Sequence, residues 1–414
     1  MSISFKLNRI ILQSLSAASL ASALVAGAQT PAAPAATAPA AADPAPAAAA
    51  PLSTFVLTGP LQWLPAASFD AGPLGKLYVN GIVTGFSQFQ NNSVPGDDNA
   101  QATLSNGQVF IQKADGKVQY YIQAGVYTMQ ALSVPFTDAQ TTMKNFYGPV
   151  PVAYLKLQAA KNTQFLIGSL PTLMGAESTF TYQNFNIERG IVWNQENAVN
   201  RGIQVNQTLN KYLSASVSWN DGYYSNRYSW LSGSVTLTKG PHTLVYDGMG
   251  NLGQTAYQTA ATPVQNNGYM HAVIYTYSKG PWIVSPYFQY GKLPTNTKVG
   301  VLKGTSATGG AVNVSYAFKR GFSLPARVEY LASSGSATDG SVNMLGFGAG
   351  SSGTTFTATP TYQKGGMYVR GDLAWVHASS YTPGSVFGTT GTDANQFRGV
   401  LEFGFIFGKN VTEK

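Results

Sequence analysis

Seven short turns, most of them built around lysine, divide this chain into pairs of strands. Each turn lies between two runs in which apolar and polar residues alternate. Their typical separation is roughly forty residues, which leaves room for two ~10-residue membrane strands, the turn itself and a longer loop at the other end. The turns occupy residues 114–117, 160–162, 210–211, 238–241, 278–281, 319–321 and 363–366.

The number of turns predicts the number of strands. Seven turns join fourteen strands, and one further strand at each end brings the total to about 16. An even number of antiparallel strands is typical of bacterial outer-membrane barrels. We therefore predict an all-β fold, a transmembrane antiparallel up-and-down β-barrel of about 16 strands that occupies residues 75–414.

The low charge content favours a membrane barrel over a soluble all-β fold. Charged residues make up 10% of the chain, against about 25% in ordinary soluble domains. The mean hydropathy is only −0.04, as expected when an apolar outer face and a polar inner face average out. A soluble sandwich would instead expose a richly charged outer face. Here Leu213, Ala215, Val217 and Trp219 alternate with Ser214, Ser216, Ser218 and Asn220.

The residues before the barrel divide into three segments. Residues 1–28 combine a basic start at Lys6 and Arg9, an apolar stretch and a small-residue cleavage site, and are predicted to be a secretory signal peptide. Residues 29–51 are almost entirely Ala and Pro and are predicted to form an extended periplasmic linker. Residues 52–74 are apolar and irregular, and the pattern leaves a plug, an interfacial segment and a strand lead-in all open.

Longer and more varied segments lie opposite the turns. They comprise residues 91–106, 129–150, 170–200, 250–267, 291–308, 333–353 and 378–394. Outer-membrane barrels have short periplasmic turns and long extracellular loops. The lysine-rich turns are therefore expected in the periplasm and the longer segments outside the cell.

The loop at residues 170–200 is the strongest candidate for a pore constriction. It gathers charged, amide and aromatic side chains in a chain that is otherwise poor in charge. Folded into the lumen, such a loop would narrow the pore and set its selectivity. The alternative is a loop packed on the barrel mouth, with its charges paired to neighbours. The candidate constriction residues are Glu188, Arg189, Trp193, Glu196 and Arg201.

This region also carries a family resemblance. The stretch QNFNIERGIVWNQEN at residues 183–197, with the strand RGIQV at residues 201–205, resembles the OmpL-like β-barrel porin family. The resemblance extends loosely over residues 75–407. It implies an outer-membrane barrel with pore activity and brings no catalytic residue with it.

A second set of candidates lies on the polar faces of the late strands. Pairs of opposite charge are spaced two or four residues apart, so that both members of a pair share one face of a strand. Rows of opposite charge in the lumen would create a transverse field that orients polar solutes. Cross-strand ion pairing is the competing interpretation, and the two need not exclude each other. The candidate pore-lining residues are Arg327, Glu329, Arg370, Asp372, Arg398 and Glu402.

Enzymatic, metal-binding and nucleic-acid-binding signals are weak. His242, His271 and His377 are scattered over different strands without metal-ligand spacing, and the chain has no Cys. No nucleophile, base and orienting group can be placed together. Basic residues lie in turns rather than in an aromatic-rich patch, despite a pI of about 9.3. We expect no catalytic residue, no cofactor, no metal and no nucleic-acid partner.

These observations predict an outer-membrane porin that lets small hydrophilic solutes or ions diffuse passively through a water-filled barrel. Its other expected partner is the lipid of the outer membrane. The alternatives are a non-conducting structural or adhesive barrel and, less favoured, an enzyme embedded in a barrel. Removing the signal peptide takes the formal net charge from +8 to +6, which suggests a mild preference for anions. The solute, the pore radius and association into a homotrimer stay open.

Overall fold

Antiparallel strands wind once round the molecule and close on themselves. The computed structural model describes residues 59–409, so the predicted signal peptide, the Ala/Pro-rich linker, residues 52–58 and residues 410–414 lie outside the described residues. The strands are β1 (Ala67–Asp70), β2 (Lys76–Gln90), β3 (Ala100–Lys113), β4 (Val118–Tyr127), β5 (Val152–Ala160), β6 (Thr163–Pro171), β7 (Val199–Asn210), β8 (Leu213–Asn220), β9 (Trp230–Lys239), β10 (His242–Asn251), β11 (Tyr269–Lys279), β12 (Trp282–Leu293), β13 (Thr305–Ala317), β14 (Phe322–Ser333), β15 (Ser352–Ala358), β16 (Thr361–Lys364), β17 (Met367–Ser379) and β18 (Asn395–Phe407).

The barrel proper has sixteen strands, which confirms the predicted fold. From β2 round to β18 each strand pairs with its neighbours, except that β15 and β16 do not pair with each other, and β18 pairs with β2 to close the ring. β15 and β16 count as one barrel strand, because both pair with β14 and β17 on either side of Pro360. Proline has no N–H to donate to a ladder, so the strand is interrupted there. The short β1 pairs only with the start of β2.

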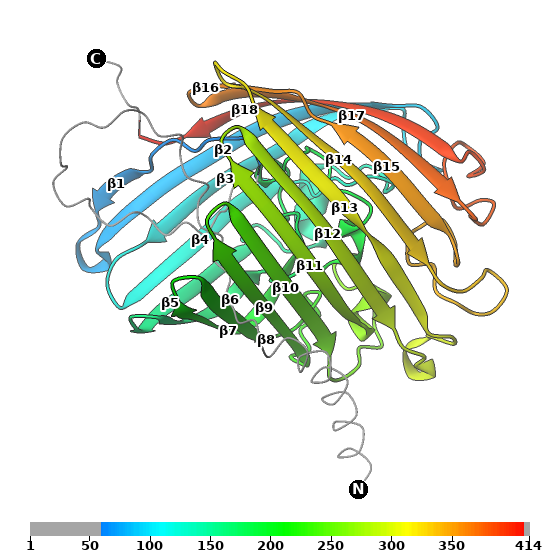
Figure 1. The fold of residues 1–414 in the computed structure, drawn as a ribbon, viewed down its shortest axis with the longest axis horizontal. Helices are drawn as coiled ribbons and strands as arrows, with labels where there is room; N and C mark the ends of the chain where they lie inside the picture. Colours follow the sequence, from blue (N-terminus) through cyan, green and yellow to red (C-terminus); the bar gives the residue numbers. More distant parts are fainter. Residues whose placement is uncertain (1–58, 410–414) are drawn as a thin grey trace, which may run out of the picture.

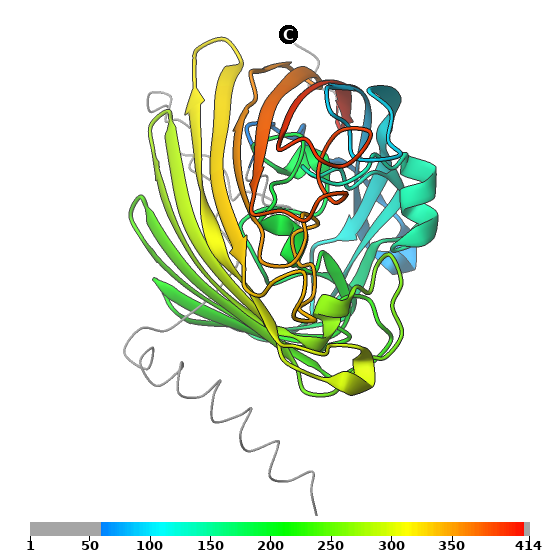
Figure 2. The ribbon, with the colours of Figure 1, turned by 90° about the vertical axis from the view of Figure 1, so that its right-hand side faces the viewer.

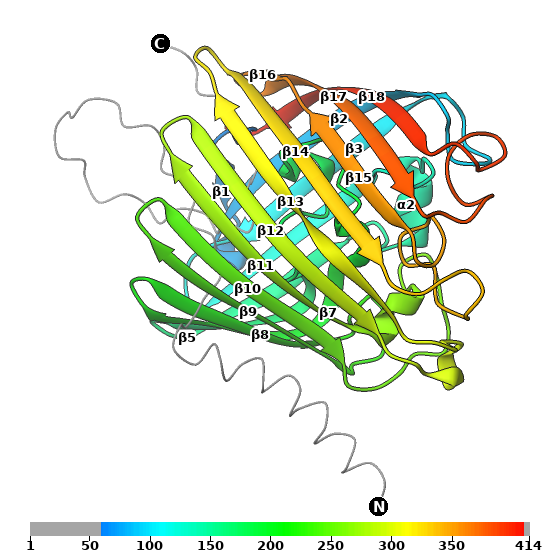
Figure 3. The ribbon, with the colours of Figure 1, turned by 45° about the vertical axis from the view of Figure 1, so that its right-hand side comes forward.

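All seven predicted turns join neighbouring strands, and the longer loops gather at the opposite end (Figures 1 and 3). The loop at residues 221–229, between β8 and β9, was absent from the predicted set. It is short, and its Tyr- and Ser-rich sequence continues the composition of the strands. The predicted loop at residues 91–106 was too long, because β3 already begins at Ala100.

Short helical segments occur only between strands in the described part of the chain. They are η1 (Gly72–Leu74), α2 (Ala139–Asn145), η2 (Thr181–Gln183), η3 (Trp193–Gln195), η4 (Val264–Asn267) and η5 (Thr297–Val299). Asp138 caps α2 by accepting hydrogen bonds from the backbone N–H groups of Gln140 and Thr141. Among residues 59–409, no helix is both long enough and apolar enough to cross a bilayer.

The strands are two-faced, as the alternation predicted. On β8, Val217 is 52% exposed while Ser216 and Ser218 are each 1% exposed. The outward face of β18 carries four phenylalanines, whereas Arg398 and Glu402 point inward and are buried. Outward aromatic rings also meet near the turns, as where Trp282 lies edge-on to Tyr316 at 4.6 Å. An apolar exterior with aromatic residues near its edges is what a lipid-facing barrel requires.

A charged side chain on this exterior should lower the stability of the folded barrel by an amount that depends on its depth in the membrane. We expect Val217→Arg, in the middle of β8, to destabilise the barrel by about 2–4 kcal/mol, because arginine would face hydrocarbon. Leu209→Arg, near the β7–β8 turn, is a matched control that should cost only about 0–1 kcal/mol. Urea unfolding in lipid vesicles measures both. Equal costs at the two positions would contradict the predicted orientation of the strands in the bilayer.

The lead-in segment enters the barrel at the turn end. Leu61 is 1% exposed and packs in one cluster with Ile82, Phe110, Tyr368 and Ile406, which are inward-facing residues of β2, β3, β17 and β18. Residues 59–66 therefore lie inside the mouth of the barrel, while β1 continues to the start of β2. The sequence left a plug, an interfacial segment and a strand lead-in open as alternatives. In the described residues, 59–66 lie at the barrel mouth and 67–70 form a strand beside β2.

Candidate functional site

The loop between β6 and β7, residues 172–198, is folded into the lumen. Gln123 on β4 donates to the Tyr182 hydroxyl at 3.3 Å, and Gln289 on β12 donates to the Val192 carbonyl at 3.1 Å. Both glutamines point inward from strands far apart around the ring. Figure 2 looks in from the loop end and shows this teal-to-green segment surrounded by strands. We call residues 172–198 the lumenal loop.

Arg327 on β14 is the first of three buried arginines that hold the lumenal loop. It is completely buried and forms an ion pair with Glu177 of the loop. Its Nε lies 3.2 Å from Glu329, two residues further along the same strand. Its Nη1 also donates to the carbonyl of Glu188 at 3.0 Å. Arg327 therefore joins the barrel wall to two separate points of the loop.

Arg370 on β17 is the second arginine. Its partner is Glu402, directly opposite on β18, at 2.9 Å from Nε and 2.5 Å from Nη2. Two donors directed at one carboxylate give a strong and well-oriented contact. The remaining N–H groups donate to the loop carbonyls of Asn184 and Thr181, at 3.2 and 3.1 Å.

Arg398 on β18 is the third arginine. It donates to Glu188 of the lumenal loop at 2.7 Å and to the carbonyl of Ala131 at 3.2 Å. Ala131 belongs to the loop between β4 and β5, so the Arg398 side chain binds both that loop and the lumenal loop. The backbone N–H of Glu188 in turn donates to Asp372 on β17 at 2.8 Å.

Carboxylates of the wall also bind the loop backbone directly. Glu329 accepts hydrogen bonds from the N–H groups of Ile191 and Val192, at 3.2 and 3.3 Å. Within the loop itself, Glu177 accepts a hydrogen bond from the N–H group of Gly190 at 2.8 Å. A Cβ on Gly190 would lie 1.8 Å from a carboxylate oxygen of Glu329. Only glycine lets the chain approach this closely.

The six wall residues predicted from sequence are thus brought together, and all except Asp372 take part in ion pairs. Only Arg327 pairs with its predicted neighbour on the same strand, Glu329. Arg370 and Arg398 instead take Glu402 and Glu188. This pairing was the alternative to free rows of opposite charge.

Two further candidates of the lumenal loop, Arg189 and Trp193, contact each other. The Arg189 guanidinium lies 4.0 Å from the ring of Trp193 and donates to the Thr179 carbonyl. Arg189 is fully buried, and this burial lowers its pKa to about 9. A cation over an indole ring is a favourable contact. The two side chains therefore form one unit inside the barrel.

Arg201 lies away from these residues, at the loop end of β7. It pairs with Asp221 at 2.7 Å, and its guanidinium stacks over Tyr224 at 3.8 Å. The Asp221 carboxylate also accepts from the backbone N–H groups of Arg201 and Asn226, at 2.7 and 3.0 Å. Arg201 thus fastens the loop at residues 221–229 to the barrel.

Glu196 differs from the other candidates because no ion pair reaches it within residues 59–409. Burial raises the pKa of Glu196 well above its usual range, and the nearby carboxylates of Glu177, Asp247 and Glu329 raise it further. Sequence reasoning missed Glu177 and Asp247. Both carried a usable signal, since Glu177 lies in the selected loop and Asp247 is a charge on an otherwise small, polar barrel face.

The described part of the chain has no metal cluster, and its histidines bond neighbouring side chains. Residues 59–409 contain no group of three or more His, Cys, Asp or Glu side chains placed to hold a metal ion. The three histidines each bond a neighbouring side chain, Tyr275, Tyr246 and Asn395 respectively. These contacts orient side chains on the strands.

Comparison with known proteins places the chain among porin-like barrels. A family model described as "Putative beta-barrel porin-2, OmpL-like" matches residues 76–407. The outer-membrane channel DcaP of Acinetobacter baumannii superposes with a TM-score of 0.55 at 13% identity, covering 83% of this chain and 100% of that one. OmpT of Vibrio cholerae in its trimer form gives 0.50 at 11% identity, over 80% and 99% of the two chains. OmpF of Salmonella typhi in complex with daunomycin gives 0.50 at 12%, over 80% and 98%. A search of curated proteins found no match.

Proposed function

Since the chain belongs to the OmpL-like β-barrel porin-2 family, we propose that it is an outer-membrane porin through which small hydrophilic solutes or ions diffuse passively. The observation that carries the proposal is the lumenal loop, which leaves the barrel rim and is fastened inside the ring by Arg327, Arg370 and Arg398. A loop held at a fixed position within a barrel sets the width of the path.

In this proposal the residues of the lumenal loop have different roles. Glu188 and Arg189 hold the loop in place, because their charged groups contact the wall and the loop itself. Trp193 supports Arg189. Glu196 has no charged partner among the described residues, and we propose it as the member of the set that interacts with the solute. Arg201 keeps the neighbouring loop at the rim.

A second candidate function has one observation in its favour. Leu61 and Trp63 fill the turn end of the barrel, where Trp63 lies edge-on to Phe110 and Tyr182 at 5.3 and 5.9 Å. A barrel filled at one end can serve as a non-conducting structural or adhesive protein. The two functions predict different electrical behaviour, so one measurement separates them.

The test is single-channel recording in planar bilayers with the full mature chain, after its folding has been checked by heat-dependent gel mobility. We expect stepwise currents with a uniform conductance. A folded protein that gives no steps would remove the porin proposal and favour the non-conducting barrel. Because OmpT occurs in a trimer form, the particle mass in detergent should be measured on the same sample, with three chains per particle as the expected value.

A further inference from the structure

Two buried carboxylates in the lumen have no counter-ion. Glu196 of the lumenal loop is 5% exposed and Asp247 of β10 is 2% exposed. Among residues 59–409, neither is joined to a cationic side chain. Both carboxylate oxygens of Glu196 and Oδ1 of Asp247 also have no hydrogen-bond partner. A buried charge without partners is unfavourable, so such a carboxylate either holds a proton or is paired by a cationic ligand.

The two carboxylates are neighbours, because both contact Gly175. A Cβ on Gly175 would fall 1.8 Å from Oε2 of Glu196, so the glycine backbone lies directly against that carboxylate. The backbone N–H of the same residue is directed at Asp247. Gly175 has a φ of +88°, a conformation that favours glycine. The loop therefore positions Glu196 beside a strand residue that faces it.

Strand β12 supplies two more acceptors to the same place. Asp247, Ala272 and Gln289 stand side by side across β10, β11 and β12, and all three are inward-facing. Oε1 of Gln289 has no partner. Tyr287, two residues earlier on β12, directs its hydroxyl at Glu196 without a regular hydrogen bond. Tyr287 is 5% exposed and Gln289 is 1% exposed, and Ala272, between Asp247 and Gln289, carries only a methyl group.

The contrast with the charged wall shows what kind of ligand these atoms fit. The carboxylates of the arginine network have donors: Glu188 and Glu402 have arginines, and Asp372 has the hydroxyl of Thr359 and a backbone N–H. At Glu196 and Asp247 the atoms without partners are oxygens, all able to accept. Such a set matches a positively charged group and repels an anion.

We propose that Glu196, Asp247, Tyr287 and Gln289 form a binding site for a cationic group in the lumen, either an alkali-metal ion or the protonated amine of a passing solute. The site makes the pore prefer cations, and this part rests on the proposed porin function. It opposes the anion preference suggested by the net charge of +6, because the lumenal arginines of the wall are already neutralised.

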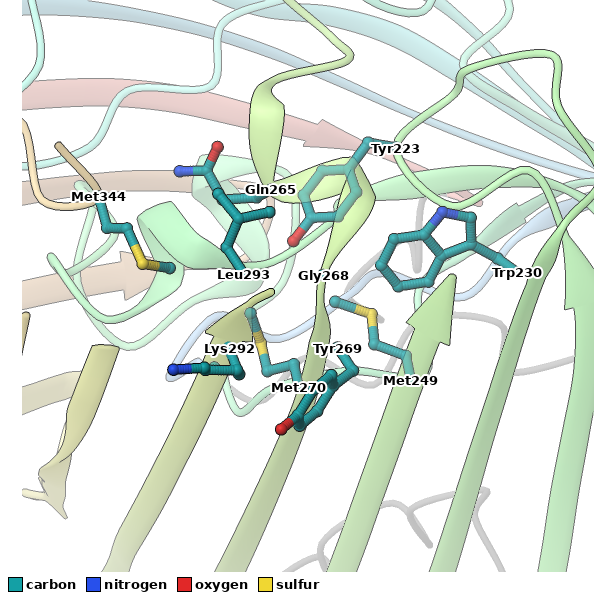
Figure 4. Close-up of a pocket in the computed structure, with 11 residues that line it drawn as sticks. Tyr223, Trp230, Met249, Gln265, Gly268, Tyr269, Met270, Lys292, Leu293 and Met344 are labelled. Carbon is teal, nitrogen blue, oxygen red and sulfur yellow. The ribbon is translucent and has the colours of Figure 1, made fainter. Parts of the chain in front are cut away.

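An apolar pocket adjoins the site on the side of the extracellular loops. One inward position further along each strand, Asp247 is followed by Met249, and Ala272 is preceded by Met270. Figure 4 shows these methionines extending toward Tyr223 and Trp230. A protonated amine with a short apolar group would bind the pocket and the carboxylates together, whereas an alkali ion would use the oxygens alone.

Reversal potentials in a KCl gradient across a planar bilayer test the preference. We expect the wild-type protein to favour potassium over chloride. In the double variant Glu196→Gln/Asp247→Asn the permeability ratio should fall about tenfold, since two charges close to the ion are removed. Asp115→Asn is the control, because Asp115 lies in the β3–β4 turn with its side chain 51% exposed, and its loss should leave the ratio unchanged. A wild-type preference for chloride, or an unchanged ratio in the double variant, would overturn the proposal.

Binding is measured separately, so that the result does not depend on conduction. The folded full chain is titrated calorimetrically with methylammonium chloride and, in a parallel arm, with potassium chloride. We expect saturable heat with the wild type and none with the double variant; a saturable signal in one arm alone identifies the class of cation. Where the double variant does not fold, the two single variants replace it. A folded protein that binds neither cation refutes the site, whereas binding without channel steps supports the site and refutes the porin function.

Discussion

Arg327→Met should destabilise the barrel by about 3–5 kcal/mol, the typical cost of removing one partner from a buried ion pair. Arg327 is completely buried and contacts Glu177, Glu329 and the Glu188 carbonyl. Methionine fills much of the same volume but leaves both carboxylates without their cation. Urea unfolding of the folded protein in detergent, followed by tryptophan fluorescence, measures the change.

The matched control is Lys303→Met, which breaks the pair between Lys303 and Asp339 outside the barrel. These side chains are 52% and 26% exposed, and exposed pairs contribute about 0–1 kcal/mol. Arg327→Met should also make single-channel conductance variable, because the lumenal loop loses an anchor. An Arg327 variant as stable as the Lys303 variant would show that the buried network does not hold the loop.

The double variant Leu61→Ser/Trp63→Ser should raise single-channel conductance by at least about twofold, because it empties the turn end of the lumen. Leu61 and Trp63 cover an apolar patch on the inner face of the barrel that includes Ile82 and Phe110. Serine in place of both side chains removes the contacts that keep residues 59–66 against this patch. The measurement is conductance in symmetric KCl, compared with the wild type.

Phe69→Ser provides the control for this variant. Phe69 lies on β1, six residues after Trp63, and is 52% exposed outside the lumen. Its replacement removes a comparable apolar group but should leave conductance unchanged. If the Leu61/Trp63 variant conducts like the wild type while remaining folded, residues 59–66 do not restrict the path.

The barrel could be predicted from sequence because its signals are local. Alternation along β8 depends only on the period of a strand, and a lysine-rich turn such as residues 278–281 requires no knowledge of distant parts of the chain. A local signal also explains why the loop at residues 221–229 was missed. Its composition resembles that of the adjoining strands, so no local change marks it as a loop. The lumenal loop stood out in the sequence because its charges are unusual in this chain, and its role as a constriction stays a prediction.

The pairing of the charges could not be predicted in the same way. Spacing along a strand shows that Arg370 and Asp372 share a face, but the register of β17 with β18 decides that Arg370 meets Glu402. Nor does any local pattern show that Arg398 reaches Glu188, or that Leu61 returns to the inside of the barrel. These contacts depend on closure of the whole ring.

The ion pairs also imply an order in which the chain can become a barrel. Glu177 and Glu188 precede their partners Arg327 and Arg398 by 150 and 210 positions. Neither acid can form its ion pair until the strand that carries its arginine is in place. β18 then supplies both the seam with β2 and the arginine for Glu188. Closure of the ring and one anchor of the lumenal loop thus come from the same strand, so loss of β18 would remove both together.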